Sequence, residues 1–313
     1  MRNATMRLAH LTDIHLPIPA PPRFRDLTNK RVLGYLSWRR RRRFRHQIEP
    51  LGAIVADCHK MHPDFTAISG DLTNIALESE FSEGFQWLKN HFNGESAAFT
   101  PGNHDAYVET PWARGLGRLS QFMMGDRREE NASRAPNDAD DFPFTRRIGD
   151  CGLVFANSSP PTAPGLATGQ LGETQINRIG AELTQLGEEK KCRILVLHHP
   201  VTEGATSGRK ALVDRKGLRK TLYESGVDLI LHGHTHRSIW ATIETKNGVR
   251  PVVGGASASH PGAHGDYRPA RYNLFSIGGD ADNGWRITVD TREFDPASGD
   301  VRTAETRMLL PIA

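Results

Sequence analysis

The chain has 313 residues, of which 37% are apolar and 24% are charged, so it has the composition of a soluble globular protein with a large core. We find no run of about 18 uncharged apolar residues, which excludes a predicted transmembrane helix. The N-terminus lacks a signal-peptide core, so we expect a cytoplasmic protein. Three cysteines without CxxC spacing argue against a disulfide framework and a cysteine zinc site, and we expect all three to be buried.

The formal net charge of +4 is unevenly distributed. Residues 23–45 contain ten Lys or Arg and one Asp, a local charge of +9, so the rest of the chain carries −5. A mildly acidic protein with one basic segment differs in composition from a general nucleic-acid-binding protein. We therefore do not expect nucleic acid to be the main partner.

Short apolar runs alternate with amphipathic helical patterns, which predicts an α/β protein. The predicted strands are residues 6–12, 65–69, 97–100, 193–197 and 227–231, with a hairpin over 142–157. The predicted helices are residues 46–62, 78–92, 174–186 and 214–225.

The chain reads as one domain over residues 1–313 with three additions. These are a basic insertion at about 23–46, an irregular insertion at about 106–141 with a short helix near 119–124, and a C-terminal β extension at about 280–313. After Arg237 a Gly-rich series of β segments predicts a second sheet. The sequence leaves the oligomeric state open.

Five of the predicted strands end in side chains of the kind that bind transition metals. Because α/β folds place their sites at the carboxyl ends of strands, we expect these side chains to meet. All the donors are oxygen or nitrogen, and they are too many for one tetrahedral ion, which predicts two metals sharing a carboxylate. In chain order the residues are Asp13, His15, Asp71, Asn103, His104, His198, His234 and His236.

These blocks resemble the calcineurin-like metallophosphoesterase superfamily, whose pattern is D-x-H, GD, GNH(D/E), H and GHxH. The chain contains every block in order between positions 13 and 236. The resemblance implies a four-layer α-β-β-α sandwich of two packed mixed sheets flanked by helices, with a dinuclear metal site at the strand carboxyl ends. Its GNHD and GHTH blocks are similar to those of class III cyclic nucleotide phosphodiesterases.

The resemblance also implies which residues hold each ion. It assigns Asp13, His15 and His236 to one metal. It assigns Asn103, His198 and His234 to the other, with Asp71 bridging both. The family ligand directly follows its strand, which favours His198 over His199. The remaining residue, His199, would then lie behind the ligands or face the substrate.

Two cations about 3.5–4 Å apart would acidify a bridging water, orient it for in-line attack on phosphorus and neutralise the phosphoryl oxygens. Two divalent ions, two aspartates, a hydroxide and one phosphodiester are together close to neutral, which favours an anionic phosphodiester as substrate. Mn and Fe are the favoured ions, and the same donors also accept Zn, Co or Ni.

His104 follows a predicted ligand, so it is placed to stabilise the transition state or to protonate the leaving oxygen. Asp105 either orients His104 or caps the turn. Asn74 either donates a hydrogen bond behind the metal site or caps the next helix, which is the favoured role. Among the other histidines we expect His10 in the core, His46, His59 and His62 on the surface, and His260 and His264 in a plain loop rather than at the substrate.

Residues 30–45 join apolar and aromatic residues to a run of arginines, Trp38 followed by Arg39, Arg40, Arg41, Arg42 and Arg43. One interpretation is a solvated helix or dimer arm. A second is a peripheral patch on an anionic membrane, where each basic residue contributes about 1 kcal/mol. A third is a nucleic-acid contact, which the acidic remainder of the chain disfavours.

The favoured function is a phosphodiesterase that hydrolyses a small phosphodiester of the cyclic-nucleotide type. The alternative is a hydrolase of a phosphorylated lipid or lipid-linked pyrophosphate, resembling UDP-diacylglucosamine pyrophosphohydrolases and docked on the inner membrane face. A nuclease or a phosphomonoesterase is less favoured. The intact ligand set argues against an inactive scaffold.

Overall fold

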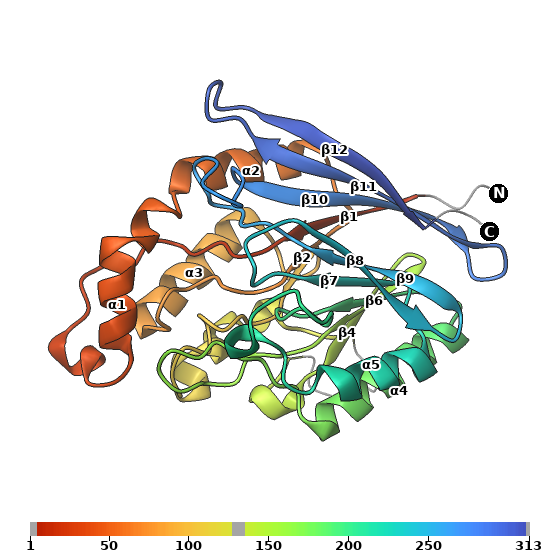
Figure 1. Cartoon of the computed structure of the whole chain (residues 1–313), viewed down its shortest axis with the longest axis horizontal. Helices are drawn as coiled ribbons and strands as arrows, with labels where there is room; N and C mark the ends of the chain where they lie inside the picture. The colour runs from red at the N-terminus through yellow and green to blue at the C-terminus, as the bar shows by residue number, and fades with distance from the viewer. Residues whose placement is uncertain (1–4, 127–134, 311–313) are drawn as a thin grey trace.

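Two six-stranded sheets form the centre of the computed structural model, which describes residues 5–126 and 135–310 (Figure 1). In the first sheet the strand order is β12-β11-β10-β1-β2-β3. Strands β1, β2 and β3 are parallel, while β10 pairs antiparallel with β1, β11 with β10 and β12 with β11, so the sheet is mixed. The bounds are β1 Met6–Leu11, β2 Phe65–Ile68, β3 Ala97–Phe99, β10 Arg271–Asp280, β11 Gly284–Phe294 and β12 Val301–Leu310.

The second sheet has the order β4-β5-β6-β7-β9-β8. Strands β5, β6, β7 and β9 are parallel, and an antiparallel strand closes each edge. The bounds are β4 Phe144–Ile148, β5 Cys151–Phe155, β6 Cys192–Val196, β7 Leu229–His232, β8 Ile239–Thr245 and β9 Gly248–Gly254.

The expectation that the strands after Arg237 form a sheet of their own is wrong. Strands β8 and β9 extend the sheet that contains β7, whereas β10 and β11 join the sheet that contains β1. The reason is burial, because Val252 and Val253 of β9 are both fully buried and need cover on both faces. Local alternation in the sequence cannot tell which of two sheets a strand enters.

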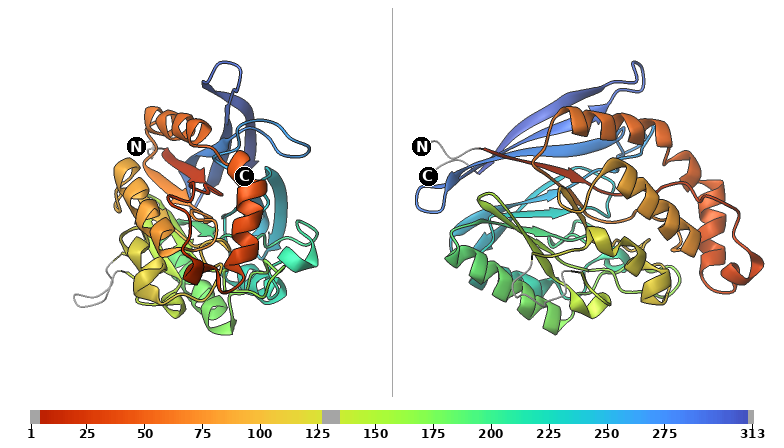
Figure 2. Two further views of the ribbon diagram at one scale, coloured as in Figure 1. Left: turned by 90° about the vertical axis from the view of Figure 1, so that its left-hand side faces the viewer. Right: turned by 180° about the vertical axis from the view of Figure 1, so that it is seen from behind.

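Helices cover the outer faces of both sheets, which confirms the four-layer α-β-β-α sandwich (Figures 1 and 2). Helix α2 packs against β11 and β12, and helices α4 and α5 pack against each other and the second sheet. Helix α1 lies at the end of the molecule, where the strands deliver the predicted ligands (Figure 1). The bounds are α1 Arg31–Arg40, α2 Ile48–Lys60, α3 Glu78–His91, α4 Glu173–Glu188 and α5 Arg215–Ser225.

The main core lies between the two sheets and joins them. Phe155 of β5 stacks on Phe144 with ring centroids 4.9 Å apart and meets Phe65 of β2 at 6.4 Å. A second cluster fills the space between the second sheet and helices α4 and α5. This packing fixes the two sheets against each other, so the loops at their carboxyl ends form one surface. The three cysteines are buried and free, as expected.

The described residues of the irregular insertion form short 3-10 helices and no α-helix. They span Trp112–Arg114, Leu116–Phe122 and Ala139–Asp141. The predicted helix near 119–124 corresponds to the second, whose Phe122 packs on Phe85 of α3 with centroids 6.5 Å apart. Residues 127–134 of this insertion, and residues 311–313 of the C-terminal extension, lie outside the described residues.

Candidate metal centre

The backbone of the predicted ligands is strained. All five of the following residues have φ between 47° and 71°, a left-handed region that side chains other than glycine rarely adopt. Such conformations cost about 1–3 kcal/mol each and cluster at functional sites. The residues are Asp13, His15, Asp71, His234 and His236.

One group of four side chains gathers at the ends of β1, β2 and β7. One donor atom from each of Asp13, His15, Asp71 and His236 lies within 4.8 Å of the others. His236 Nε2 lies 3.2 Å from Asp13 Oδ1, and His15 Nε2 lies 3.6 Å from Asp71 Oδ2. Buried Asp13 Oδ1 has no hydrogen-bond partner among the described residues. A cation is the partner that would suit this oxygen and the two imidazoles together.

A second group lies on the other side of Asp71. Asn103 Oδ1 is 2.7 Å from His234 Nδ1 and 3.2 Å from His198 Nε2. His198 Nε2 is in turn 3.4 Å from Asp71 Oδ2. Asp71 Oδ2 therefore lies between His15 and His198 and connects the two groups, which is the position that a bridging carboxylate requires.

Backbone carbonyls orient the imidazoles. His15 Nδ1 is 3.1 Å from the carbonyl of Thr73, and His198 Nδ1 is 2.8 Å from that of Ser69. Donation by Nδ1 leaves the Nε2 lone pair of each ring for a metal. His234 has the opposite arrangement, because its Nε2 lies 3.0 Å from the carbonyl of Lys210 and its Nδ1 faces Asn103.

The charges of the site also suit metal ions. Burial holds the pKa of His15 and of His234 well below the usual value, so both are neutral. Burial would raise the pKa of Asp71, but the charges of His198 and His104 lower it well below its usual range. Burial opposes protonation of His198 as well, yet Asp71 raises its pKa to about 9. Asp71 therefore keeps the His198 ring protonated, and a metal ion would replace that proton as the positive charge beside Asp71. Neutral imidazoles around an ionised carboxylate fit two divalent ions.

His104 lies beside the ligands and its orientation is fixed. Its backbone amide donates to Asp71 Oδ1 at 2.7 Å, and its Nδ1 lies 2.6 Å from the carbonyl of Asn74. The ring stacks on Tyr107 with an interplanar angle of 8°. Burial, followed by the charge of Arg42, lowers the pKa of His104 to about 4.

Asp105 takes the turn-capping role and does not hydrogen-bond to the His104 side chain. Its carboxylate accepts the backbone amides of Asp71, Thr73 and Gly102 at 2.8–2.9 Å. Burial and the charge of Asp71 raise its pKa to about 7, and the amide donors oppose this shift. Asp105 therefore ties together the two loops that carry Asp71 and Asn103.

Asn74 supports the site through its backbone, not as a helix cap. Helix α3 begins at Glu78 after Leu77, so the expected capping role is wrong. The Asn74 side chain donates to the carbonyl of Leu16 at 2.6 Å, while its own carbonyl contacts His104.

His199 is buried behind the second group. Its Nδ1 is 2.9 Å from Ser158 Oγ and its Nε2 is 3.3 Å from the carbonyl of Ala167. Its ring centroid lies 4.5 Å from that of His234. Since both ring nitrogens have partners in the protein, His199 supports His234 from behind and His198 stays the candidate ligand.

Two histidines that the sequence placed elsewhere lie beside the site. His46, expected on the surface, is only 5% exposed, and its ring lies 4.2 Å from that of His15. His260, expected in a plain loop, is buried 5.0 Å from His46. Helix α2 begins at Ile48, so His46 lies in the segment before the helix and not on its exposed face, and its side chain points inward. No pattern in the sequence around either histidine indicates that it lies beside the site.

His10, His59 and His62 behave as predicted, whereas His264, expected in a plain loop, lines a cavity. His10 is buried, with Nε2 2.8 Å from Ser69 Oγ, and His59 and His62 are exposed. His264 is exposed at the mouth of the cavity described below.

The arginine run does not form one uniform surface. Arg42 turns inward, with its Nη1 2.7 Å from His104 Nδ1 and its Nη2 donating to the carbonyl of Gly34 at 3.0 Å. The other four arginines of the run are exposed. Trp38 stacks on Tyr35 and packs against a buried apolar cluster, so it is not free to insert into a membrane as the patch interpretation supposed.

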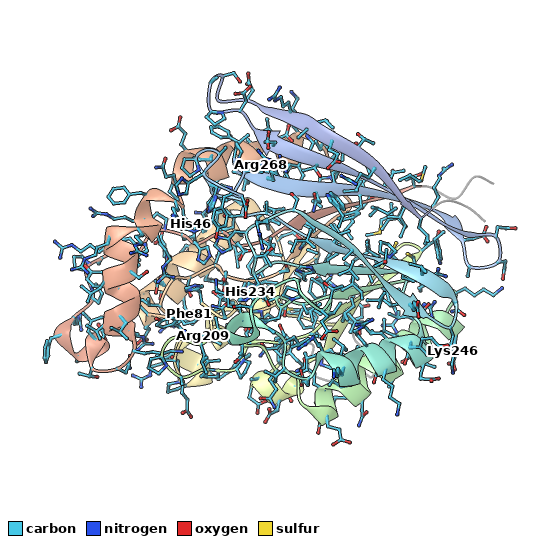
Figure 3. The ribbon with its side chains drawn as sticks, in the orientation of Figure 1. His46, Phe81, Arg209, His234, Lys246 and Arg268 are labelled. Carbon is cyan, nitrogen blue, oxygen red and sulfur yellow. The ribbon has the colours of Figure 1, made fainter. Side chains whose placement is uncertain are left out.

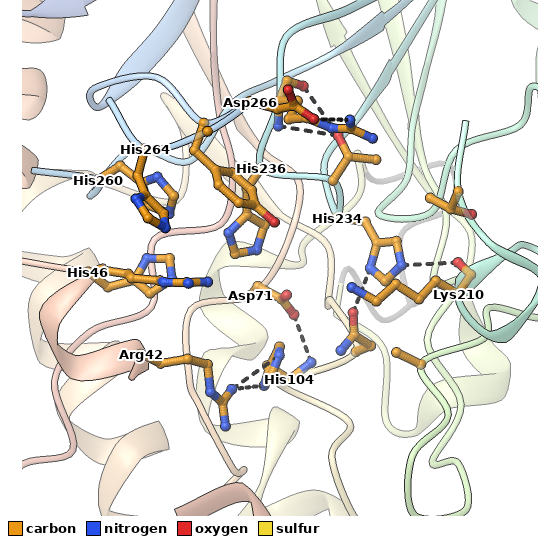
Figure 4. A pocket seen from close by; sticks show the side chains of 18 of the residues that line it. Arg42, His46, Asp71, His104, Lys210, His234, His236, His260, His264 and Asp266 are labelled. Atoms are coloured by element: carbon orange, nitrogen blue, oxygen red, sulfur yellow. Dashed lines mark hydrogen bonds and ion pairs between the residues drawn. The ribbon is translucent and has the colours of Figure 1, made fainter. Parts of the chain in front are cut away.

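Both ligand groups open into one cavity of about 570 Å³ (Figure 4). Asp71 lies between His46 on one side and His234 on the other. Basic side chains line the mouth, among them Arg45, Lys210 and Arg237. Figure 3 places His234 near the middle of the molecule and His46 toward α1. A cavity of this size holds a small molecule, and its basic lining favours an anion.

Comparison with known proteins agrees with this arrangement. Residues 6–238 match the family described as calcineurin-like phosphoesterase. No curated protein sequence matches the chain significantly.

Similar solved structures share the fold at low sequence identity. A dimetal phosphatase from Danio rerio is 12% identical with a TM-score of 0.60, and the match covers 97% of this chain and 98% of that one. A purple acid phosphatase from yellow lupin (Lupinus luteus) seeds is 12% identical with a TM-score of 0.59, over 99% of this chain and 54% of that one. The anchor in the inner membrane complex of Plasmodium is 12% identical with a TM-score of 0.50, over 99% of this chain and 90% of that one.

Proposed function

Because the chain belongs to the calcineurin-like phosphoesterase family, whose members are metal-dependent phosphoester hydrolases, we propose that it is a phosphodiesterase acting on a small phosphodiester of the cyclic-nucleotide type. The observation that carries the proposal is the position of Asp71 between two ligand groups that open into one basic cavity. When bound, two divalent ions supply an acidified water and neutralise the phosphoryl charge.

The ligand assignment that we propose follows the two groups. Asp13, His15 and His236 hold one ion, Asn103, His198 and His234 hold the other, and Asp71 contacts both. The strained backbone at five of these residues supports a functional role, because a loop without one would adopt a conformation of lower free energy.

The protein's own side chains then bind and orient the substrate. Lys210 and Arg45 at the mouth attract an anionic substrate into the cavity. Inside it, His104 Nδ1 donates to the carbonyl of Asn74, so Nε2 is the nitrogen that can bind a second proton and pass it to the leaving oxygen. Arg42 Nη1, 3.2 Å from the same Nε2, adds positive charge where the leaving oxygen becomes negative.

The first experiment compares a diester with a monoester. Metal-free protein is reloaded with Mn²⁺ and assayed on bis(p-nitrophenyl) phosphate and on p-nitrophenyl phosphate, with Asn103→Ala and His104→Ala as controls. We expect preferential cleavage of the diester that both substitutions reduce. Preference for the monoester would replace the proposal with a phosphatase. With diester cleavage established, cyclic nucleotides and lipid diesters are compared as substrates.

A second candidate function is hydrolysis of a phosphorylated lipid or lipid-linked pyrophosphate. A neighbouring groove of about 410 Å³ is lined by Arg40, Arg41 and Phe44 and shares Arg45 and Tyr267 with the metal cavity. A substrate with a phosphoryl group and an apolar chain could therefore occupy both. This continuity is the observation that supports the second candidate.

The basic insertion that supplies this groove with arginines also exposes apolar side chains, which suits an anionic membrane. Phe24 is 90% exposed, Leu33 56% and Phe44 55%, and exposed arginines lie among them. Apolar side chains with adjacent basic residues bind peripherally to anionic lipid. None of the helices in the described part of the chain is long and apolar enough to cross a bilayer.

Vesicle sedimentation distinguishes the two candidates. Vesicles containing phosphatidylglycerol are compared with pure phosphatidylcholine vesicles, using wild type and an Arg39→Glu, Arg40→Glu, Arg43→Glu variant that leaves Arg42 intact. Sedimentation with the anionic vesicles alone, lost in the variant, supports the lipid substrate. Equal behaviour on both vesicle types leaves the cyclic-nucleotide type as the remaining proposal.

A further inference from the structure

His46 lies at the first ligand group although it comes from the basic insertion. One ring nitrogen from each of His15, His46 and His236 lies within 4.8 Å of the others. His15 and His236 are also members of the group with Asp13 and Asp71. His15 and His236 therefore connect His46 to the group that contains the two aspartates.

The ring of His46 is held by a hydrogen-bonded chain that ends on a ligand. Its Nδ1 is 2.8 Å from Ser259 Oγ, which lies 3.2 Å from Ser257 Oγ. Ser257 Oγ donates to the backbone carbonyl of Asp13 at 2.6 Å. The amide of Gln47 also donates to the carbonyl of Ser259 at 2.9 Å. A histidine that binds a metal through one ring nitrogen usually forms a hydrogen bond through the other. The Nδ1 of His46 forms that hydrogen bond, so its Nε2 is available to an ion.

The ring separations agree with coordination of a common ion. With a metal–nitrogen distance of about 2.1 Å, each ring centroid lies about 3.2 Å from the metal, so two rings are about 4.5 Å apart at 90° and about 5.5 Å at 120°. The centroid of His15 is 4.2 Å from that of His46 and 5.1 Å from that of His236, and His46 is 5.3 Å from His236. All three separations lie close to that range.

We propose that His46 is an additional ligand of the first ion, beside Asp13, His15, Asp71 and His236. The inference rests on the dinuclear site of the proposed function. Five side-chain donors exceed the three or four that protein zinc sites use, and they approach the six of an octahedral ion. A first position with five donors suits an ion that accepts five or six ligands, such as Mn²⁺ or Fe²⁺.

Manganese titration tests this directly. Metal-free wild type, His46→Gln and His260→Gln are titrated with Mn²⁺, and free Mn²⁺ is measured by electron paramagnetic resonance. His260 is the matched control because it is buried 5.0 Å from His46 but lies outside the donor groups. We expect two ions in wild type and in His260→Gln. In His46→Gln one of the two affinities falls at least about tenfold.

Two outcomes separate failure of this inference from failure of the proposed function. Two ions bound with equal affinity in wild type and His46→Gln would overturn the role of His46 and leave the dinuclear site intact. Fewer than two ions in wild type would overturn the dinuclear site itself. If His46→Gln fails to fold, a crystal structure of manganese-loaded wild type decides, because a ligand requires Nε2 within about 2.3 Å of the ion.

Discussion

Arg42 Nη1 lies 2.7 Å from Nδ1 of His104, although 62 residues separate the two in the sequence. The guanidinium also donates to the carbonyls of Asn74 at 3.3 Å and Gly34 at 3.0 Å. One arginine of an otherwise exposed run thus connects helix α1 to the loop that orients His104. The basic insertion is for this reason part of the site and not only a surface feature.

Replacing Arg42 by methionine should reduce kcat more than it raises KM, because the substitution frees His104 and removes positive charge near the leaving oxygen. We expect a loss of about 10–100-fold in kcat and about 1–3 kcal/mol in the free energy of unfolding. Arg43→Met, which removes the same charge from an exposed position, is the control. Steady-state kinetics that are equal in the two variants would remove Arg42 from the site.

The ligands at strand ends depend on residues that are neighbours in the chain, whereas the surroundings of the site depend on tertiary contacts. Strands ending in ligands could be predicted, since an apolar run and the polar residues at its end are neighbours in the chain. Asp71, His198 and His234 could be predicted to lie close together because the carboxyl ends of parallel strands meet at the same edge of a sheet. The sandwich itself followed from the family resemblance and is confirmed.

The residues that the sequence misplaced reach the site through tertiary contacts. His46 approaches His15 only because α2 packs on β11 and β12, and Arg42 faces inward only because Gly34 lets α1 lie against Ile75 and Tyr107. A Cβ at Gly34 would come within 2.6 Å of Ile75. No periodicity within residues 30–46 encodes these contacts, so the arginine run gave no sign of which arginine turns inward.

The role of His104 predicts a dependence on the leaving group. In His104→Gln, proton donation is lost while the ligands remain, so kcat should fall about 10²–10⁴-fold for a substrate with a poor alkoxide leaving group. For p-nitrophenolate, which leaves without a proton, the loss should be much smaller. A methyl p-nitrophenyl diester and a dialkyl diester give the two rates. Equal losses on both would assign His104 to charge stabilisation instead of proton transfer.

Acid should destabilise the metal-free protein below pH 6.5. Burial lowers the pKa of His10 and His199 to about 3 and that of His232 to about 4. Each folded pKa lies below the unfolded value of 6.5, so the stability that each histidine contributes is present above pH 6.5 and is lost as pH falls toward 4. The slope is about 1.4 kcal/mol per pH unit for each group. Urea unfolding between pH 4.5 and 7 measures it, and His10→Gln should lower the slope by one group.

His198 contributes to stability with the opposite pH dependence, and it also makes metal binding depend on pH. Its folded pKa of about 9 exceeds the unfolded value, so its pairing with Asp71 stabilises the metal-free protein below pH 6.5 and is lost as pH rises through 9. An ion must displace this proton, so metal affinity should rise with pH between 6.5 and 9. Titration calorimetry at pH 7.5 in two buffers of different ionisation enthalpy should show about one proton released by His198. A release that is unchanged in His198→Gln would contradict this source of the proton.

Gly233 should be essential for the first ligand group because no side chain fits there. A Cβ at this position would overlap Thr12 Oγ1 and come within 2.7 Å of Asp13 Oδ2, the oxygen that accepts the amide of His234 at 3.0 Å. Gly233→Ala should therefore displace Asp13 and weaken one Mn²⁺ site at least about tenfold.

The matched control is Gly208→Ala, because a Cβ at Gly208 meets nothing within 4 Å and its φ is not in the left-handed region. We expect that variant to bind two ions as wild type does. Circular dichroism of the metal-free proteins establishes whether Gly233→Ala remains folded, since Thr12 lies at the end of β1 and its displacement need not disturb the rest of the sheet. A folded Gly233→Ala variant with unchanged affinity for both ions would mean that Asp13 does not hold a metal, and the first ligand group would have to be reassigned.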